Sequence, residues 1–137
     1  MNPVVVHVLQ WLGRVSAKVV HKISHDARSA GIGPNLAELN GMFAFAIWER
    51  DRERLFLARD RLGVKPLYLS RNGERLRFAS TLPALLKGGD IDPMLDPVAL
   101  NHYLNFHAVV PAPRTLLANV QKLEPGTWMR IDRHGEV

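Results

Sequence analysis

The stretch that decides the fold is NGMFAFAIW, residues Asn40–Trp48. Large and small apolar residues alternate along it, which places Phe43, Phe45 and Ile47 on one face of an extended chain and the intervening alanines on the other. Because both faces are apolar, the pattern predicts an interior strand that is covered on each side.

Three further strands are expected downstream, and together they predict a β-meander. A charged turn leads into a second strand over Arg54–Arg59, which makes a hairpin. A third strand is expected over Pro66–Ser70 and a fourth over Arg75–Ser80. Asn72 and Gly73 lie between these two and favour a tight hairpin turn, since both residues tolerate positive φ. Four antiparallel strands in chain order would form a meander.

Short helices, an extended segment and a last strand complete the expected fold. Helices are expected over Thr81–Lys87, which two glycines follow, and over Val98–Phe106, which Asp96 would cap. Val109–Pro113 must be extended, because each proline restrains the residue before it. The final strand is expected over Thr127–Asp132. The chain is therefore predicted to be α+β, an antiparallel β-meander with short helices.

Length and composition limit the possible functions. The chain has 137 residues, enough for one domain of ordinary size. Its lack of cysteine excludes a disulfide scaffold, a thiolate metal site, a redox CxxC motif and a cysteine nucleophile. No long run of uncharged apolar residues is present, so we expect no membrane span and no membrane partner.

The chain is basic, with a net charge of +5 and a pI of about 10.1. Its basic residues between Arg50 and Lys65 nevertheless alternate with acidic ones. Mixed signs give local pairs and not the one-sign stripe that a nucleic acid would need. We therefore expect a solvated surface and no nucleic-acid partner.

The first 33 residues differ in character from the rest. Apolar residues recur at spacings of three and four between Val5 and Ile23, which is typical of an amphipathic helix or of a basic targeting peptide. His21 and His25 have the spacing of a helical metal pair, and His7 lies nearby, but no further ligand is evident, so no metal site is expected. Glycine and proline then mark a boundary at Gly33-Pro34.

Five motifs then carry a family resemblance. In chain order they are Leu39–Trp48, Leu55–Tyr68, Phe78–Ser80, Val110–Thr115 and Lys122–Gly126. Their sequences and order resemble the glutaminase domain of glutamine-dependent asparagine synthetases. The resemblance covers residues 34–137, which we expect to be a partial glutamine amidotransferase type 2 domain; residues 1–33 would be a divergent or out-of-frame segment.

The resemblance implies an N-terminal-nucleophile (class II amidotransferase) sandwich, with two antiparallel sheets between helix layers. In that family an N-terminal cysteine attacks the carboxamide of glutamine, and its own α-amine acts as the base. The released ammonia passes to a second domain, which uses ATP and Mg to amidate an acid. The resemblance thus implies glutamine as substrate and a cytoplasmic enzyme.

This chain departs from the family at both reaction centres. It has no cysteine, and the 38 residues before Leu39 show none of the family's catalytic motifs. The ATP-binding loop would lie beyond Val137. We therefore expect a fragment that is inactive alone, with no catalytic or substrate-binding residue and no cofactor of its own. The alternatives are a decayed remnant and a non-catalytic docking module that self-associates or docks through an exposed sheet.

The family motifs supply residues that we expect to be structural. They are Asn40, Gly41, Arg59, Asp60, Gly63, Pro66 and Arg114. Asn40-Gly41 should begin the first buried strand, and Arg59-Asp60 should belong to a structural ion-pair network near a domain junction.

Two short motifs and one departure need an interpretation. Asn72-Gly73-Glu74 spells an oxyanion-binding tripeptide, but a hairpin turn explains the same residues. Gly126-Thr127 could be a self-cleavage pair that exposes a threonine nucleophile, although a loop that enters a strand is favoured. Phe106–Val110 is similar to a branch that amidates an N-acetylglutaminylglutamine-type dipeptide, which leaves the acceptor open between that dipeptide and aspartate.

Overall fold

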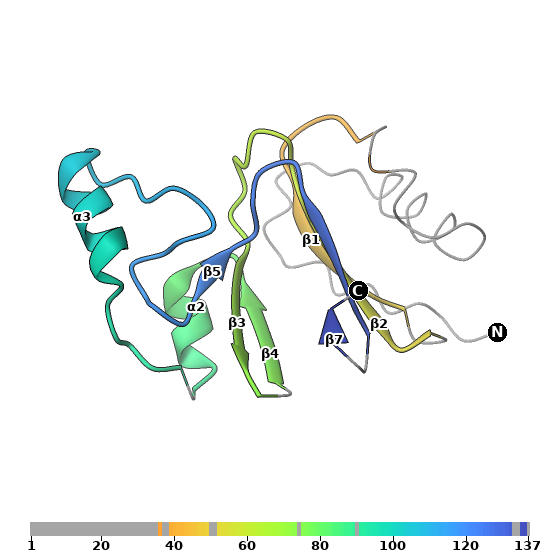
Figure 1. Ribbon diagram of the computed structural model, residues 1–137. Coiled ribbons are helices and arrows are strands. Elements are labelled where there is room, and N and C mark those ends of the chain that lie inside the picture. The colour runs from red at the N-terminus through yellow and green to blue at the C-terminus, as the bar shows by residue number, and fades with distance from the viewer. Residues whose placement is uncertain are drawn as a thin grey trace.

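The computed structural model describes residues 36, 39–49, 52–73, 75–89, 91–132 and 135–136. The predicted helix over the first residues, the histidines His7, His21 and His25 and the boundary at Gly33 all lie outside the described residues. Within the described part, the fold is mixed α/β with two antiparallel sheets and few helices, as predicted (Figure 1).

The strands divide between two sheets. The first sheet has the order β1-β2-β6-β7 and the second has the order β4-β3-β5. The bounds of the strands are β1 Ala44–Glu49, β2 Arg54–Arg59, β3 Tyr68–Asn72, β4 Arg75–Ala79, β5 Gln121–Lys122, β6 Trp128–Asp132 and β7 Gly135–Glu136.

The predicted meander is wrong, although both predicted hairpins are confirmed. β1 pairs with β2 and β3 pairs with β4, but β2 does not continue to β3. The second edge of β2 is taken by β6, and the second edge of β3 by β5. The chain therefore leaves the first sheet after β2 and enters the second sheet with β3. In a meander β3 would lie beside β2, but here β6, which comes much later in the sequence, lies there instead.

The second hairpin turns one residue later than predicted. Asn72 pairs with Arg75, so Asn72 belongs to β3 and the loop begins at Gly73. Gly73 has a φ of 57°, the left-handed conformation that a tight turn requires. The strand β3 consequently runs from Tyr68 and not from Pro66, since its partner strand fixes its register.

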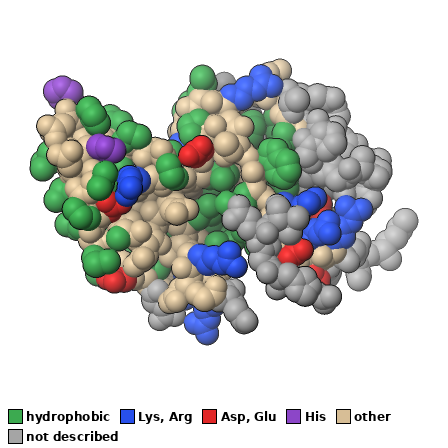
Figure 2. All heavy atoms as spheres, in the orientation of Figure 1, with side chains coloured by type: hydrophobic (Ala, Val, Ile, Leu, Met, Phe, Trp, Pro, Cys, Tyr) green, Lys and Arg blue, Asp and Glu red, His purple; other side chains and the backbone are tan. Residues whose placement is uncertain are grey.

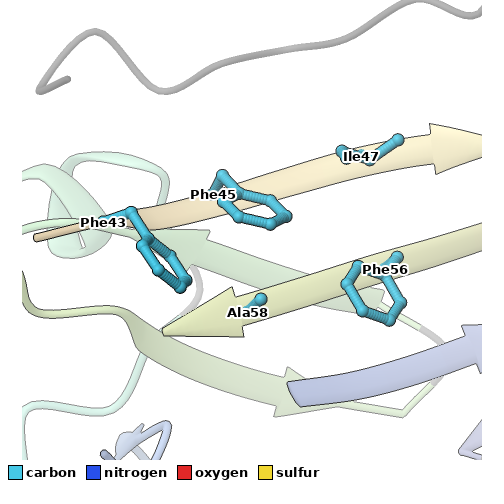
Figure 3. Packing of buried hydrophobic residues seen from close by; sticks show 5 residues of the cluster. All are labelled: Phe43, Phe45, Ile47, Phe56 and Ala58. Carbon is cyan, nitrogen blue, oxygen red and sulfur yellow. The ribbon is translucent and has the colours of Figure 1, made fainter. Parts of the chain in front are cut away.

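Three apolar clusters show how the layers pack. The outer cluster lies on one face of the first sheet, and Figure 3 shows its side chains on β1, on β2 and on the residue just before β1: Phe43, Phe45, Ile47, Phe56 and Ala58. The inter-sheet cluster draws on both sheets: Ala46, Leu57, Leu67, Leu69 and Leu123. The helix cluster lies on the other side of the second sheet: Ala79, Leu85, Leu117 and Val120. The two faces of β1 therefore serve two cores, as its alternating apolar pattern predicted.

Both predicted short helices are present. The helix α2, Leu82–Lys87, is capped by Thr81, whose hydroxyl accepts a hydrogen bond from the Ala84 N–H at 3.3 Å. The helix α3, Pro97–Asn105, is capped by Asp96. Leu85 of α2 is buried against the second sheet, whereas α3 projects away from the sheets (Figure 1).

Candidate functional site

The junction between the two sheets is organised around Arg59, the last residue of β2. Its guanidinium donates to three main-chain carbonyls: Nε to Lys65 at 2.8 Å, Nη1 to Leu123 at 2.6 Å and Nη2 to Gly63 at 2.5 Å. The side chain is only 9 % exposed. A planar fork of donors suits several carbonyls at once, so Arg59 joins the loop after β2 to the segment after β5.

Asp60, the next residue, stabilises the same loop with a negatively charged side chain. Its carboxylate accepts main-chain N–H groups, from Leu62 and Val64 on Oδ1 at 3.1 and 3.0 Å, and from Lys65 on Oδ2 at 3.0 Å. Its own N–H donates to the Phe43 carbonyl at 2.8 Å, just before β1. Burial by itself raises the pKa of Asp60, but the N–H groups of Lys65, Val64 and Leu62 hold it below the ordinary value of 3.8.

Gly63 is required at this junction by conformation and by space. Its φ is +64°, and an added Cβ would lie 2.7 Å from Cγ of Pro125 and 3.0 Å from Nη2 of Arg59. The Gly126 N–H donates to the Asp60 carbonyl at 2.8 Å, which ties the turn before β6 to the same loop. Pro66, partly buried, follows in the loop that leads to β3.

Lys122 in β5 holds a third segment against the junction. Its main-chain N–H donates to the Pro113 carbonyl at 2.7 Å, and its ammonium group donates to the Val110 carbonyl. Burial lowers the pKa of the Lys122 ammonium, and the positive charge of Arg59 lowers it further. In the sequence, Lys122 stands out only as part of the motif Lys122–Gly126, because nothing about a lone lysine indicates that its amine is directed at the main chain.

Thr115 is a second residue whose role the sequence does not reveal. Its side chain is 3 % exposed, and its hydroxyl lies 2.8 Å from the Val120 carbonyl oxygen and accepts the Leu117 N–H at 3.0 Å. The hydroxyl therefore closes the loop that precedes β5. A buried threonine in a loop satisfies main-chain groups in this way, but sequence alone does not say which threonine is buried.

Arg114 lies in a separate cluster at the start of α3. Its Nη1 donates to Oδ2 of Asp96 at 2.5 Å, and Oδ1 of Asp96 accepts the N–H groups of Val98 and Ala99 at 2.8 and 3.1 Å. The Ala99 N–H is the main cause that lowers the pKa of Asp96; burial opposes it, and Arg114 and the Val98 N–H add to it. Arg114 thus fixes the residue that caps the helix.

Asn40 and Gly41 lie elsewhere than predicted. Both are exposed and precede β1, which begins only at Ala44. Gly41 has a φ of +115°, and nothing lies within 4 Å of the position of an added Cβ. The predicted strand start is therefore wrong, because this backbone is not extended and the apolar residues that pair with β2 begin later.

The two other candidate motifs are ordinary connections. Asn72-Gly73 lies at the β3–β4 hairpin, as predicted, although Asn72 is the last residue of β3 and the loop begins at Gly73. Thr127 precedes β6, and its hydroxyl donates to the Glu124 carbonyl at 2.7 Å, which confirms the expected loop that enters a strand.

The described residues do not form a site for a divalent metal. No three histidine, aspartate or glutamate side chains among them lie close enough together to hold an ion. The carboxylate of Asp60 is occupied by three N–H groups, and that of Asp96 by a helix cap and Arg114. Magnesium is bound by carboxylate oxygens that are free to coordinate it, so neither Asp60 nor Asp96 fits an Mg site. In the same part of the chain, no helix is long and apolar enough to cross a membrane.

Most of the chain is similar to a known protein family. A family model described as a glutamine amidotransferase domain matches residues 23–137. The chain belongs to this family. Asparagine synthetase [glutamine-hydrolyzing] 1 from Bacillus subtilis (strain 168) is 40 % identical to it over 101 residues, 74 % of this chain and 16 % of the relative. Asparagine synthetase [glutamine-hydrolyzing] 3 from the same organism is 32 % identical over 97 residues, 71 % of this chain and 16 % of the relative.

A relative with a different name is also similar to this chain. Amidase chry2 from Gibberella zeae is 30 % identical over 94 residues, 69 % of this chain and 13 % of the relative. The chain spans about a sixth of the length of the two synthetases that it matches.

Proposed function

We propose that this domain is the structural body of a class II glutamine amidotransferase in an asparagine-synthetase-type enzyme. In such an enzyme glutamine is hydrolysed, and the ammonia passes to an ATP-dependent amidation. The observation that carries the proposal is the junction of Arg59 and Asp60, which fastens two antiparallel sheets that share one apolar core. That arrangement is compatible with the sandwich of the N-terminal-nucleophile fold, and the names of the relatives support the reaction.

The role proposed for the family motif residues is to hold the fold. Arg59, Asp60, Gly63 and Pro66 belong to the junction, and Arg114 to the cap of α3. Asn40 and Gly41 shape the exposed approach to β1. We assign none of them to bond breaking, because their polar side chains are directed at the main chain, at the carboxylate of Asp96 or at solvent. Residues 34–137 would then be the partial amidotransferase domain, and residues 1–33 a divergent segment.

The chain by itself is proposed to be inactive towards glutamine. The family's thiol nucleophile is missing, since the sequence contains no cysteine. The ATP and Mg of the amidation would belong to a separate synthetase domain, as the resemblance to the family implies. The acceptor would be aspartate or, given the motif Phe106–Val110, an N-acetylglutaminylglutamine-type dipeptide.

The test is ammonia release from glutamine by the purified 137-residue chain, compared with buffer and with the chain denatured in advance. We expect release at the buffer rate, and release well above it would overturn the proposed inactivity. Sequencing the gene together with the DNA on both sides tests the lineage. A reading frame for Met-Cys-Gly upstream and an ATP-binding Ser-Gly-Gly loop downstream are expected. The absence of both would contradict the synthetase assignment and favour a docking module.

A further inference from the structure

Two of the seven asparagines of the chain are followed by glycine, in the pairs Asn40-Gly41 and Asn72-Gly73. Neither pair has a chemical role in the proposed function. An asparagine before glycine is nevertheless well suited to a reaction between its side-chain carboxamide and the main chain, because glycine has no Cβ to hinder the approach of its own nitrogen. The structure places the two pairs in different surroundings, so their reactivity should differ.

The reaction is an intramolecular attack by the glycine nitrogen on Cγ of the asparagine. A bond forms between that nitrogen and Cγ, the Cγ–Nδ2 bond breaks, and Nδ2 leaves as ammonia with the proton that the glycine nitrogen loses. Water then opens the cyclic imide at either carbonyl, which leaves aspartate or isoaspartate. Ring closure requires a free glycine N–H and an asparagine ψ outside the extended range, because only then does the glycine nitrogen face Cγ.

Asn40-Gly41 is free to reach this geometry. Both residues are exposed and lie in the segment that leads to β1, which is neither helix nor strand (Figure 1). Gly41 has a φ of +115°, and nothing lies within 4 Å of the position of an added Cβ. In the part of the chain that the structure describes, no main-chain carbonyl accepts the Gly41 N–H. Few contacts therefore oppose a rotation of the Asn40 ψ.

Asn72-Gly73 is held in a geometry that prevents the attack. Asn72 is exposed, but it is the last residue of β3 and pairs with Arg75 across the hairpin. This pairing keeps the ψ of Asn72 extended. The hairpin must therefore open before the Gly73 nitrogen can approach the Asn72 side chain, and that opening costs free energy.

We propose that Asn40 is the site at which this protein deamidates spontaneously and forms isoaspartate, whereas the β3–β4 hairpin protects Asn72. An isoaspartate at this position adds a carbon atom to the main chain shortly before the Phe43 carbonyl, which accepts the Asp60 N–H at 2.8 Å. The modification thus falls at the entry to β1. The inference does not depend on the proposed function, because the reaction uses only the chain itself and solvent water.

The modification also changes the charge of the molecule. The chain has a net charge of +5, and each deamidation replaces a neutral amide with a carboxylate. Lys and Arg side chains lie scattered among acidic and apolar ones over the face shown in Figure 2. On that face the described residues form no single basic patch that would dominate binding to an ion exchanger. The deamidated chain should therefore separate from the unmodified chain and elute earlier from a cation exchanger.

The experiment is incubation of the full chain at neutral pH, followed at intervals by proteolysis at mildly acidic pH and mass spectrometry of the peptides. Deamidation at Asn40 should be about tenfold or more faster than at Asn72, the factor that an opening free energy of about 1.4 kcal/mol for the hairpin produces. In urea, which unfolds the chain, the two rates should converge, because asparagine before glycine then has the same freedom at both positions.

Two matched variants check the assignment. Asn40→Gln should abolish the main acidic species, because glutamine would have to close a larger ring and does so slowly. Asn72→Gln should leave that species unchanged. Both side chains are exposed, so we expect unchanged circular dichroism in both variants. The comparison of folded and urea-unfolded wild type needs no variant and tests the proposal even if a substitution disturbs folding.

Equal rates at the two sites in the folded chain, or a faster rate at Asn72, would overturn the proposal. A ratio of rates that stays the same in urea would overturn it too, because the local sequence and not the fold would then set the ratio. Persistence of the main acidic species in Asn40→Gln would have the same consequence. The ammonia of this reaction appears without glutamine and stops at one molecule per site, so the result is independent of the test for glutamine hydrolysis.

Discussion

Arg59 and Asp60 are adjacent residues of opposite charge, and the side chains of both form hydrogen bonds mainly with main-chain groups. The guanidinium of Arg59 reaches carbonyls in two separate loops, and the carboxylate of Asp60 collects N–H groups within one of them. Buried main-chain groups are costly when they lack partners, so a charged side chain that satisfies several at once stabilises an irregular loop. At the residue scale, the side chains of Arg59 and Asp60 supply hydrogen bonds to main-chain groups that have no β-sheet partner once the chain leaves β2.

Gly63→Ala should destabilise the domain by about 2–4 kcal/mol, from the strained positive φ and from crowding. The crowding arises because the new Cβ would lie 2.7 Å from Cγ of Pro125. Gly73→Ala is the control, since Gly73 also has a positive φ but has nothing within 4 Å. It should cost only about 1 kcal/mol. Urea unfolding measures both, and equal losses would show that crowding at Gly63 contributes nothing.

Asp60→Asn should cost about 2 kcal/mol at neutral pH, because the amide group turns a donor towards N–H groups that need an acceptor. The effect depends on pH in a definite direction. The folded pKa lies below the ordinary value of 3.8, so ionisation favours the folded state; this stabilisation is complete above pH 3.8 and is lost as the pH falls through the folded pKa.

The free energy of unfolding of the wild-type chain should therefore fall more steeply below pH 3.8 than that of Asp60→Asn, and the two should converge. Urea unfolding at a series of pH values measures this. Parallel curves would show that another carboxyl group controls the acid response.

At the scale of elements, the helices were more predictable than the connections between strands. Each helix begins at a capping side chain and a proline that are visible in the sequence, Thr81 with Pro83 and Asp96 with Pro97. Such caps act within a few residues, so the sequence contains the whole interaction. The hairpins were predicted for the same reason, whereas the partner of each outer edge came from far along the chain.

Thr81→Ala should destabilise the domain by about 1 kcal/mol, through loss of the hydrogen bond to the Ala84 N–H. Thr81→Ser keeps the hydroxyl and should stay close to the wild type. Thermal unfolding of the three proteins distinguishes the cap from other effects of the threonine side chain. A loss in Thr81→Ser equal to that in Thr81→Ala would contradict the capping role.

Arg114→Ala should loosen α3 while it leaves the sheets unchanged, because Arg114 holds the Asp96 carboxylate that caps the helix. Hydrogen exchange of the amides of Val98–Leu104 should become faster, and exchange in β1 and β2 should not change. Arg71→Ala is a suitable control, as Arg71 is an exposed residue of β3. Uniformly faster exchange in Arg114→Ala would show instead that this residue supports the whole domain.

At the scale of the whole molecule, the inter-sheet cluster makes the two sheets one unit. Leu57 lies in β2 of the first sheet and is fully buried against residues such as Leu69 in β3 of the second. Close packing transmits the loss of one side chain to its neighbours on both sides. Damage to this cluster should therefore be felt in both sheets.

Leu57→Ala should cost about 2–5 kcal/mol and should lower hydrogen-exchange protection in β3 and β4 as well as in β1 and β2. Leu85→Ala, in the helix cluster, removes a side chain of the same size and should affect α2 and the second sheet first. Protection that falls only in the first sheet after Leu57→Ala would show that the two sheets unfold separately.

The sequence by itself determined the local features of this protein: the strand with two apolar faces, both hairpins, both capped helices and the family to which the chain belongs. These follow from interactions between residues close in the chain, or from motifs long enough to be specific. Only the tertiary structure decided that β6 and β5 take the edges left open by β2 and β3. It also decided that Arg59 reaches the carbonyl of Leu123 and that Asn40-Gly41 lies exposed ahead of β1. The physical reason is that long-range pairing depends on the competition among all strand edges and apolar faces at once, and local spacing carries no record of that competition.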